Sequence, residues 1–282
     1  MADTIADASA DPAYRQSPRR VPGPTVARKL SHPATILTRF APCLLLAALP
    51  ALADEGISPD RPDFTNGPEV IAAGRLQLET SGAWQRDGAT RQRATPTLLR
   101  LGLGHALELR LESEGLLRQR APLARGRGDM SVGLKWKQSD ASDDGPALGW
   151  LLQLATPTGS GDFKGRGMRP AAALLAAWEL PRGYSLGTMA GLVSDRDESG
   201  RRYTGAMLSA SLGLPLGEPL GGFVEAAAQR LAPARHGGNV VTLGTGLTWQ
   251  LGSNARLDAA IFRGLSRPAP DWAGTVGVSL RF

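Results

Sequence analysis

Charged residues recur at every second position in several short stretches, a spacing that can gather them in one confined space. "ALELRLESE" carries Glu108, Arg110 and Glu112 between leucines, and "DMSVGLKWK" carries Lys135 and Lys137 between apolar residues. Successive side chains of a β-strand point to opposite faces, so each stretch has a charged face and an apolar face. Enclosed charges either pair in a structural network or line a hydrated path, and both alternatives stay open. The candidate lumen-lining residues are Glu79, Arg100, Glu108, Arg110, Glu112, Lys135, Lys137 and Asp258.

Residue patterns typical of catalytic or metal sites are missing. Beyond the N-terminal leader the histidines are His105 and His236, and neither has a His, Cys or carboxylate at metal-ligand spacing. The chain has no G-x-S-x-G, P-loop or H-E-x-x-H motif. We therefore predict no catalytic residues, no metal site, no cofactor and no enzymatic activity.

The elements that must position the charges are short alternating strands. "RLQLETSGAW", "VTLGTGLTWQL" and the C-terminal "DWAGTVGVSLRF" each alternate between apolar and polar or small residues. Roughly twelve such segments follow residue 74, each about ten residues long, which fits a tilted strand crossing a bilayer. The pattern predicts an all-β protein, an up-and-down antiparallel transmembrane β-barrel of about twelve strands over residues 74–282.

The connections between these segments alternate in length. The even-numbered connections are mostly short, at 104–106, 181–183, 215–219 and 252–255. The odd-numbered connections are polar and generally longer, with 86–95 and 114–128 among the predicted loops. Short turns at one end and longer loops at the other are typical of outer-membrane barrels.

The six tryptophans lie on the apolar faces of their segments and near the segment ends. This placement predicts an aromatic girdle at the two membrane boundaries. The alternative is a soluble β-sandwich with tryptophans in its core, because its strands alternate in the same way. The predicted girdle residues are Trp84 and Trp272 at the outer rim, and Trp136, Trp150, Trp178 and Trp249 at the inner rim.

The N-terminal stretch "TRFAPCLLLAALPALADEG" resembles a secretory signal. Arg39 supplies a positive charge, the apolar region runs from Cys43 to Leu49, and 51–53 offers a small-x-small cleavage site. We assign residues 1–53 to a leader with a signal peptide. Half of the formal net charge of +6 lies in this leader, so the remaining chain has only a small positive excess. An exported chain with so little excess charge is not expected to bind nucleic acid.

Residues 54–73 precede the first predicted strand. The prolines in "ISPDRPDFTNGPEV" exclude a central strand. One interpretation is a plug in the periplasmic mouth of the barrel, with Asp60, Arg61 and Asp63 bonded to lumen charges. The other is a solvated link between signal peptide and barrel.

The last strand ends on Phe282 and resembles the terminal recognition signal of bacterial outer-membrane proteins. The expected partners are therefore the barrel-assembly machinery, through this strand, and outer-membrane lipid. An ordinary terminal strand of a soluble sheet is the alternative.

Several stretches together resemble the transporter family named for the meta-pathway of phenol degradation. They include "PTLLRLGLGHALELRLESEG", "LLQLATPTGSG" and the opening motif Asp60, Arg61, Pro62, Asp63 and Phe64. The resemblance implies a barrel in the bacterial outer membrane, acting as a transporter or channel for passive passage of small compounds. Aromatic or hydrophobic compounds are the candidates, and the substrate itself is left open. The alternatives are a structural or adhesive barrel without transport, or a soluble periplasmic β-protein that binds a ligand.

Overall fold

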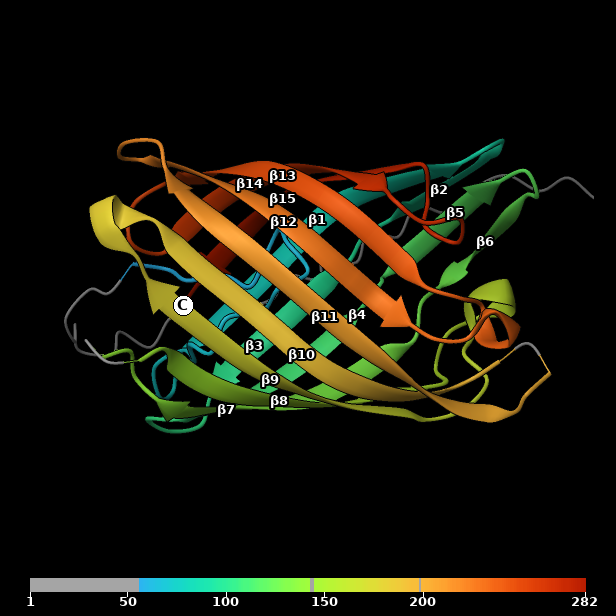
Figure 1. Cartoon of the computed structure of the whole chain (residues 1–282), viewed down its shortest axis with the longest axis horizontal. Helices are drawn as coiled ribbons and strands as arrows, with labels where there is room; N and C mark the ends of the chain where they lie inside the picture. Colours follow the sequence, from blue (N-terminus) through green and yellow to red (C-terminus); the bar gives the residue numbers. More distant parts are fainter. Residues whose placement is uncertain (1–55, 143–144, 198) are drawn as a thin grey trace, which may run out of the picture. The chain divides into compact units, whose positions relative to one another are not determined.

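One closed antiparallel sheet forms the wall of a barrel in the computed structural model (Figure 1). The structure describes residues 56–142, 145–197 and 199–282, and the predicted leader and signal peptide (1–53) lie outside these ranges. Successive segments along the chain pair with one another, and β15 (Trp272–Arg281) returns to pair with β1 (Leu76–Asp87). Closure satisfies the backbone of both edge strands, as a sheet in lipid requires.

Fifteen β segments make twelve barrel strands, because three barrel strands consist of two segments each. The interrupted strands are β2 (Thr90–Ala94) with β3 (Thr97–Gly102), β4 (Leu107–Ser113) with β5 (Leu116–Arg120), and β6 (Ala124–Arg127) with β7 (Met130–Ser139). The predicted fold class is therefore confirmed. The remaining segments are β8 (Ala147–Thr156), β9 (Arg169–Glu179), β10 (Ser185–Arg196), β11 (Arg202–Pro215), β12 (Leu220–Leu231), β13 (Val240–Gln250) and β14 (Ala255–Gly264).

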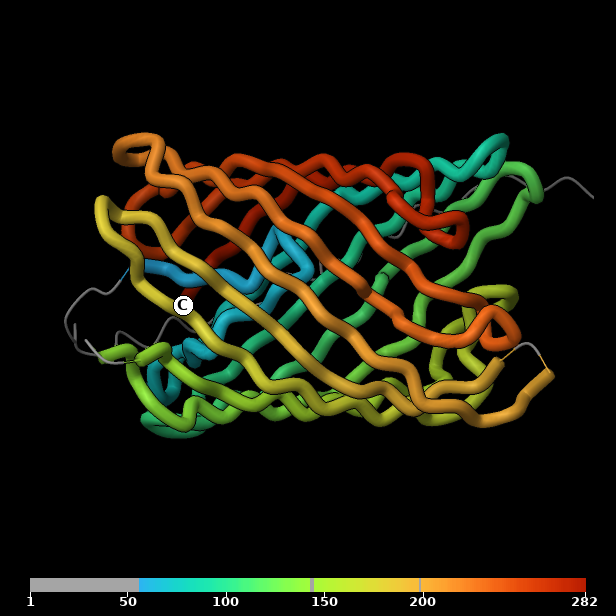
Figure 2. The backbone as a smooth tube through the Cα atoms, in the orientation of Figure 1, coloured from blue at the N-terminus to red at the C-terminus, as the bar shows by residue number. Residues whose placement is uncertain are grey.

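Short turns gather at one end of the barrel and longer connections at the other, as the tube in Figure 2 shows. The short-turn end holds the connections 103–106, 180–184, 216–219 and 251–254, with the 3-10 turn η2 (Pro181–Gly183). The other end holds 157–168, 232–239 and 265–271, with η1 (Gly161–Phe163) and η3 (Ala234–His236). No helix in the described ranges is long and apolar enough to cross a membrane.

The structure corrects two of the predicted loops. Much of 86–95 and of 114–128 is strand, because β1 runs on to Asp87 and β2, β5 and β6 lie within these ranges. Their sequences, such as "TRQRA" and "LLRQR", alternate arginine with glutamine and have few apolar residues. Strands that continue past the apolar part of a barrel need no apolar face, so hydrophobic alternation could not reveal them.

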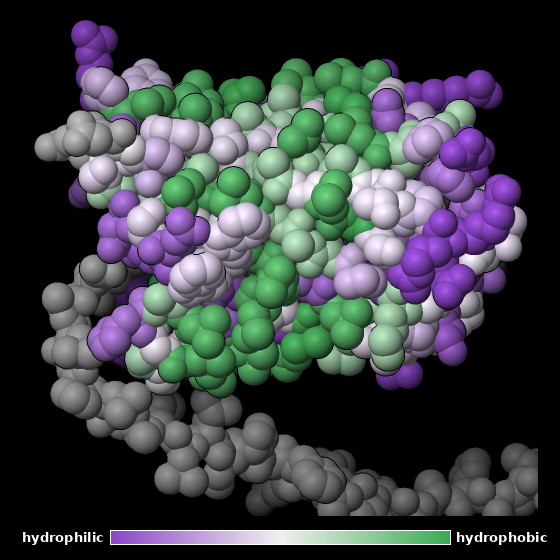
Figure 3. Space-filling view, turned by 60° about the horizontal axis from the view of Figure 1, so that its bottom comes forward, coloured by the Kyte–Doolittle hydropathy of each residue, from purple (hydrophilic) through white to green (hydrophobic). Residues whose placement is uncertain are grey.

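The outward face of the barrel is apolar around its middle. Figure 3 shows a broad hydrophobic band, with hydrophilic residues concentrated towards the ends. Five of the six tryptophans are between 39% and 50% exposed, and Trp178 is half-buried. These rings point outward from a closed barrel, so the sandwich alternative, with tryptophans in a protein core, is wrong. The structure places Trp84 and Trp272 at the long-loop end and the other four near the short-turn end.

Leu109 offers a direct test of which face meets lipid. It pairs with Leu101 and Leu134 within the outward apolar band, one outward position from the pair of Leu107 and Trp136, while its neighbour Arg110 is 2% exposed and points inward. We expect Leu109→Arg to destabilise the folded barrel by about 2–4 kcal/mol, because the charge is then placed in the bilayer core. Urea titration in lipid vesicles measures the change, with Leu109→Val as the control. Equal unfolding midpoints for Leu109→Arg and the wild type would contradict the assignment.

Candidate functional site inside the barrel

Residues 56–73, the plug segment, lie inside the short-turn half of the barrel (the blue segment of Figure 2). Ile57 and Ile71 are 5% and 6% exposed. The amide of Ile57 donates to the carbonyl of Ser253 at 2.9 Å, and that of Ile71 to Oε2 of Glu108 at 3.0 Å. Its backbone polar groups therefore bond to the barrel wall, whereas a solvated link would bond to water.

Asp60 lies among three cations of the wall. Its carboxylate accepts hydrogen bonds from Lys135 Nζ at 2.6 and 2.9 Å and from Arg110, and Arg100 Nη1 lies 3.6 Å away. The Asp60 side chain is 8% exposed, and those of the three cations at most 3%. Burial acts to raise the pKa of Asp60, but the charges of Arg100, Lys135 and Arg110 outweigh it and hold the pKa far below its ordinary value. Asp60 is therefore ionised and locks the plug segment to the wall.

Arg100 connects the carboxylates of the barrel wall to the backbone of the plug segment and uses all five of its N–H donors to do so. Nε and Nη2 donate to the Glu108 carboxylate at 2.7 and 2.8 Å, and Nη1 donates to Glu79 at 3.0 Å. The other two donors reach the carbonyls of Ser58 at 2.9 Å and Glu69 at 3.2 Å. A guanidinium saturated by protein acceptors has no donor left for a passing solute, so Arg100 holds the structure together.

The opposite wall anchors the plug segment through Glu225. Its carboxylate accepts from the amides of Phe64 and Thr65 at 3.1 and 2.7 Å, and from Thr65 Oγ1 at 2.7 Å. Thr65 Oγ1 also lies 2.8 Å from Ser209 Oγ. With Asp60 bound to β4 and β7 and Thr65 to β11 and β12, the segment spans the lumen.

Two arginines, Arg61 and Arg256, fix the segment against β14 and β15. Arg61 Nη2 donates to Thr275 Oγ1 at 2.7 Å and lies 3.3 Å from Asp258. Arg256 Nη2 donates to the carbonyls of Pro59 and Arg61 at 3.3 and 2.5 Å. The segment is therefore held by polar side chains of β3, β4 and β7 on one side, and of β11, β12, β14 and β15 on the other.

Asp63 lies close to the carboxylate of Glu225 and makes the binding of the plug segment to the barrel wall sensitive to pH. Burial, together with the charge of Glu225, raises the pKa of Asp63 from 3.8 to about 7. The carboxyl binds its proton more tightly in the plugged state than in the released segment. The contribution of Asp63 to the stability of the plugged state is therefore fully present at low pH. It declines as the pH rises above 3.8 and is lost as the pH passes about 7.

We expect the plug to loosen as the pH rises through about 7, because ionised Asp63 then repels Glu225. Single-channel recordings between pH 5 and pH 9, a range chosen to span that pKa, should show more frequent openings at the alkaline end. Asp63→Asn should remove most of this dependence, since the amide keeps the shape without a titrating proton. An unchanged pH profile in Asp63→Asn would assign the effect to another group.

The structure brings most of the sequence-derived lumen candidates together. Glu79, Arg100, Glu108, Arg110, Lys135 and Asp258 are each at most 4% exposed inside the barrel. Two others lie outside the central network. Glu112 is half-buried and accepts from Gln153 Nε2 at 2.6 Å. Lys137 lies at the short-turn mouth between Glu69, at 2.9 Å, and Asp140.

Sequence reasoning missed Glu225 and Arg256. Glu225 lies in the Ala- and Gly-rich segment "GGFVEAAAQRL", and Arg256 lies near the start of the mixed segment "ARLDAAIFRG". The available signal was spacing: Glu225 lies two positions after Phe223, and Arg256 two positions before the predicted lumen residue Asp258, so each pair shares one face of its strand. Among the described residues, no three His, Cys, Asp or Glu side chains are arranged to hold a metal ion.

Part of the inner wall is apolar. Leu151, Ala173, Leu175 and Met189 of β8–β10 form a buried cluster inside the barrel, against which Phe64 of the plug segment packs. Strict alternation assigned apolar residues to the lipid face, and here they point inward. The lumen therefore has a charged side, on β1, β3, β4 and β7, and an apolar side on β8–β11.

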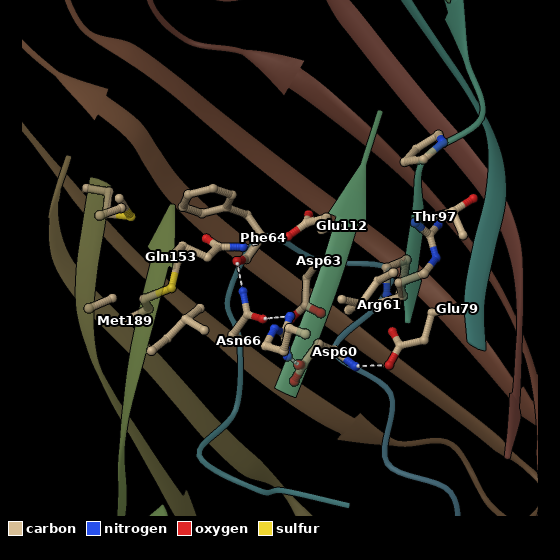
Figure 4. Close-up of a pocket in the computed structure, with 18 of the residues that line it drawn as sticks. Asp60, Arg61, Asp63, Phe64, Asn66, Glu79, Thr97, Glu112, Gln153 and Met189 are labelled. Atoms are coloured by element: carbon tan, nitrogen blue, oxygen red, sulfur yellow. Dashed lines mark hydrogen bonds and ion pairs between the residues drawn. The ribbon is translucent and has the colours of Figure 1, made fainter. Parts of the chain in front are cut away.

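A cavity of about 210 Å³ lies between these two sides, next to the plug segment (Figure 4). Met189 and Gln153 lie on one side of it, and Arg61 and Glu79 on the other. Two larger cavities, of about 520 and 650 Å³, share Phe64 and Glu112 with it and extend towards the long-loop end. The arrangement can receive a small molecule with one apolar and one polar edge.

Comparison with known proteins gave a family and a fold. The family model described as MetA-pathway of phenol degradation matches residues 59–282. An outer membrane channel from Pseudomonas putida F1 is similar in structure, with 11% sequence identity and a TM-score of 0.58 over 80% of this chain and 100% of that chain. The KdgM porin in complex with disordered oligogalacturonate is similar with 10% identity and a TM-score of 0.53, over 73% and 99% of the two chains. None of the curated protein sequences compared with this chain matches it.

Proposed function

Since the chain belongs to the MetA-pathway of phenol degradation family, we propose that it is an outer-membrane channel for the passive passage of small aromatic or hydrophobic compounds. The family match and the barrel fold support an outer-membrane location, and so does the apolar band on the outward face. Both structural relatives are themselves named as a channel or a porin.

The observation that carries the proposal is the two-sided cavity above the plug segment. An aromatic ring packs well against Leu151, Met189 and Phe64, and thioethers contact ring edges favourably. A polar substituent on the same ring can meet Gln153 beside the apolar residues, or Arg110 on the charged side. A volume of about 210 Å³ suits a single substituted ring.

Passage inward must then cross the level of the plug segment. Its polar anchors are ion pairs and hydrogen bonds that water can replace, and Ile57, Phe64 and Ile71 add apolar contacts. The segment takes no part in the strand pairing of the wall, so it can be displaced without unfolding the wall. The barrel supplies the path, and the plug segment controls when the path is open.

The test is solute flux into vesicles that contain the purified protein. Labelled 4-hydroxybenzoate, too polar to cross lipid quickly at neutral pH, is compared with glucose. We expect faster entry of the aromatic solute, and Leu151→Glu should slow it by placing a charge on the apolar side of the cavity. The control is Leu152→Ala on the outward face of β8, where Leu152 is 52% exposed, and it should leave the flux unchanged.

Flux of both solutes at the rate of protein-free vesicles would contradict a channel. It would favour the second candidate, a structural barrel without transport. The observation that supports this alternative is that all five N–H donors of Arg100 bind protein acceptors, because such a network also suits a permanently filled lumen.

A further inference from the structure

The long-loop end of the barrel carries an exposed face of arginines that the proposed channel does not use. They lie on the outward side of β1, β2, β5 and β6, and every one of them is exposed. The inward positions between them include Gln92 and Gln119, which are half-buried. We define the arginine face as Arg86, Arg91, Arg93, Arg118, Arg120 and Arg125.

Strand pairing sets these arginines directly opposite one another. In one row Arg91 pairs with Arg86 on one side and with Arg120 on the other. In the next row Trp84, Arg93, Arg118 and Arg125 follow one another across four strands. Neighbouring strands are about 4.8 Å apart, and like charges directly opposite each other destabilise a sheet. The arrangement therefore calls for an anion that the sheet itself does not contain.

The part of the chain that the structure describes supplies no ion-pair partner for this face. Among the described residues no carboxylate lies within ion-pair distance of any of the six arginines. Other arginines at the same end are paired, as Arg169 is with Asp129 at 2.8 Å. Asp271, beside the β1–β2 turn, is occupied by the amide of Gly88 at 2.9 Å.

The position of the face identifies the anion. Arg93 pairs with Trp84, and Arg86 pairs with Trp272. Both rows of arginines therefore lie beside the outward tryptophans that mark the edge of the apolar band. Leu116, 58% exposed on the same side of β5, adds apolar contact next to the charges. Tryptophans at a barrel rim mark the boundary with the lipid headgroups, so the arginines lie at headgroup level.

We propose that the arginine face binds the phosphate groups of a phosphorylated glycolipid in the outer leaflet, of the lipid A type. The proposal rests on the outer-membrane location in the proposed function. Guanidinium groups bind phosphate oxygens through two parallel hydrogen bonds, and clustered basic residues at a membrane surface bind anionic lipid. The acyl chains then cover Leu116 and Trp84, and the phosphates neutralise the opposed rows.

The experiment titrates the purified full-length protein in neutral detergent with bisphosphorylated lipid A, and measures the Kd by native mass spectrometry. The test variant Arg93→Gln/Arg118→Gln removes two opposed members of the face. We expect it to bind about tenfold more weakly or worse, because charge-assisted hydrogen bonds to phosphate are lost. The matched control Arg235→Gln/Arg267→Gln removes the same charge from exposed loop positions at the same end and should keep the wild-type Kd.

Two further measurements test whether the phosphate groups are needed for binding, and whether free phosphate can replace the lipid. Dephosphorylated lipid A should bind as weakly to the wild type as lipid A does to the test variant. Inorganic phosphate at millimolar concentration should not displace bound lipid A. Equal affinity of the wild type and the test variant, or equal affinity for dephosphorylated lipid, would overturn the proposal. Single-channel conductance of the test variant should equal that of the wild type, so loss of lipid binding and loss of channel function are distinguishable.

Discussion

Asp60→Ala should raise the open probability and the conductance of the channel severalfold. The substitution removes the only plug-segment carboxylate that Lys135, Arg110 and Arg100 share in the described part of the chain. The three cations are then left facing one another in a buried space, which favours entry of water and release of the segment. The change should appear in planar-bilayer recordings, and the released segment should become a site of limited proteolysis.

The matched control is Asp140→Ala. Asp140 pairs with Lys137 at the short-turn mouth, and its side chain is 82% exposed. Its removal takes away the same charge without touching the lumen network, so conductance should stay at the wild-type level. An Asp60→Ala channel that conducts like the wild type would show that this anchor does not hold the plug segment in place.

Arg100→Ala should destabilise the barrel itself. The substitution leaves Glu79 and Glu108, both 0% exposed, without their main counter-charge. Removing one partner of a buried ion pair costs about 3–5 kcal/mol. Urea unfolding in lipid vesicles should show this loss, together with a smaller heat-modifiable fraction on gels.

The double variant Arg100→Ala/Glu108→Ala gives the internal control for this effect. Removing Glu108 as well takes away one of the stranded carboxylates, so the double variant should be more stable than Arg100→Ala. Arg267→Ala, at an exposed loop position, should unfold like the wild type. If Arg100→Ala costs no more than Arg267→Ala, the lumen network contributes little and the charges are solvated.

The strands and their charged faces could be predicted because both follow from a period of two. In "ALELRLESE" each leucine faces outward and each charge faces inward, so the lumen position of Glu108 and Arg110 follows from spacing alone. In β8 and β9 the same rule fails. "ALGWLLQLAT" and "AAALLAAWE" have apolar residues on both faces of the strand, so the sequence does not indicate that Leu151 and Leu175 point inward.

The contacts of the plug segment could not be predicted, because they join residues far apart in the chain. Asp60 meets Lys135 across 75 positions, and Thr65 meets Ser209 across 144. Which wall residue stands opposite a given plug residue depends on strand tilt and stagger, which a single strand does not reveal. The sequence marked the segment as irregular and charged, and the closed barrel determined its partners.

The most direct test of a gated path locks the plug segment to the wall. Thr65 Oγ1 and Ser209 Oγ lie 2.8 Å apart, and the sole native cysteine, Cys43, belongs to the predicted leader. In Thr65→Cys/Ser209→Cys, a disulfide should abolish 4-hydroxybenzoate flux, and reduction with dithiothreitol should restore it, while each single-cysteine variant stays active under both conditions. Undiminished flux through the fully cross-linked channel would contradict the account, because solutes would then bypass the plug segment.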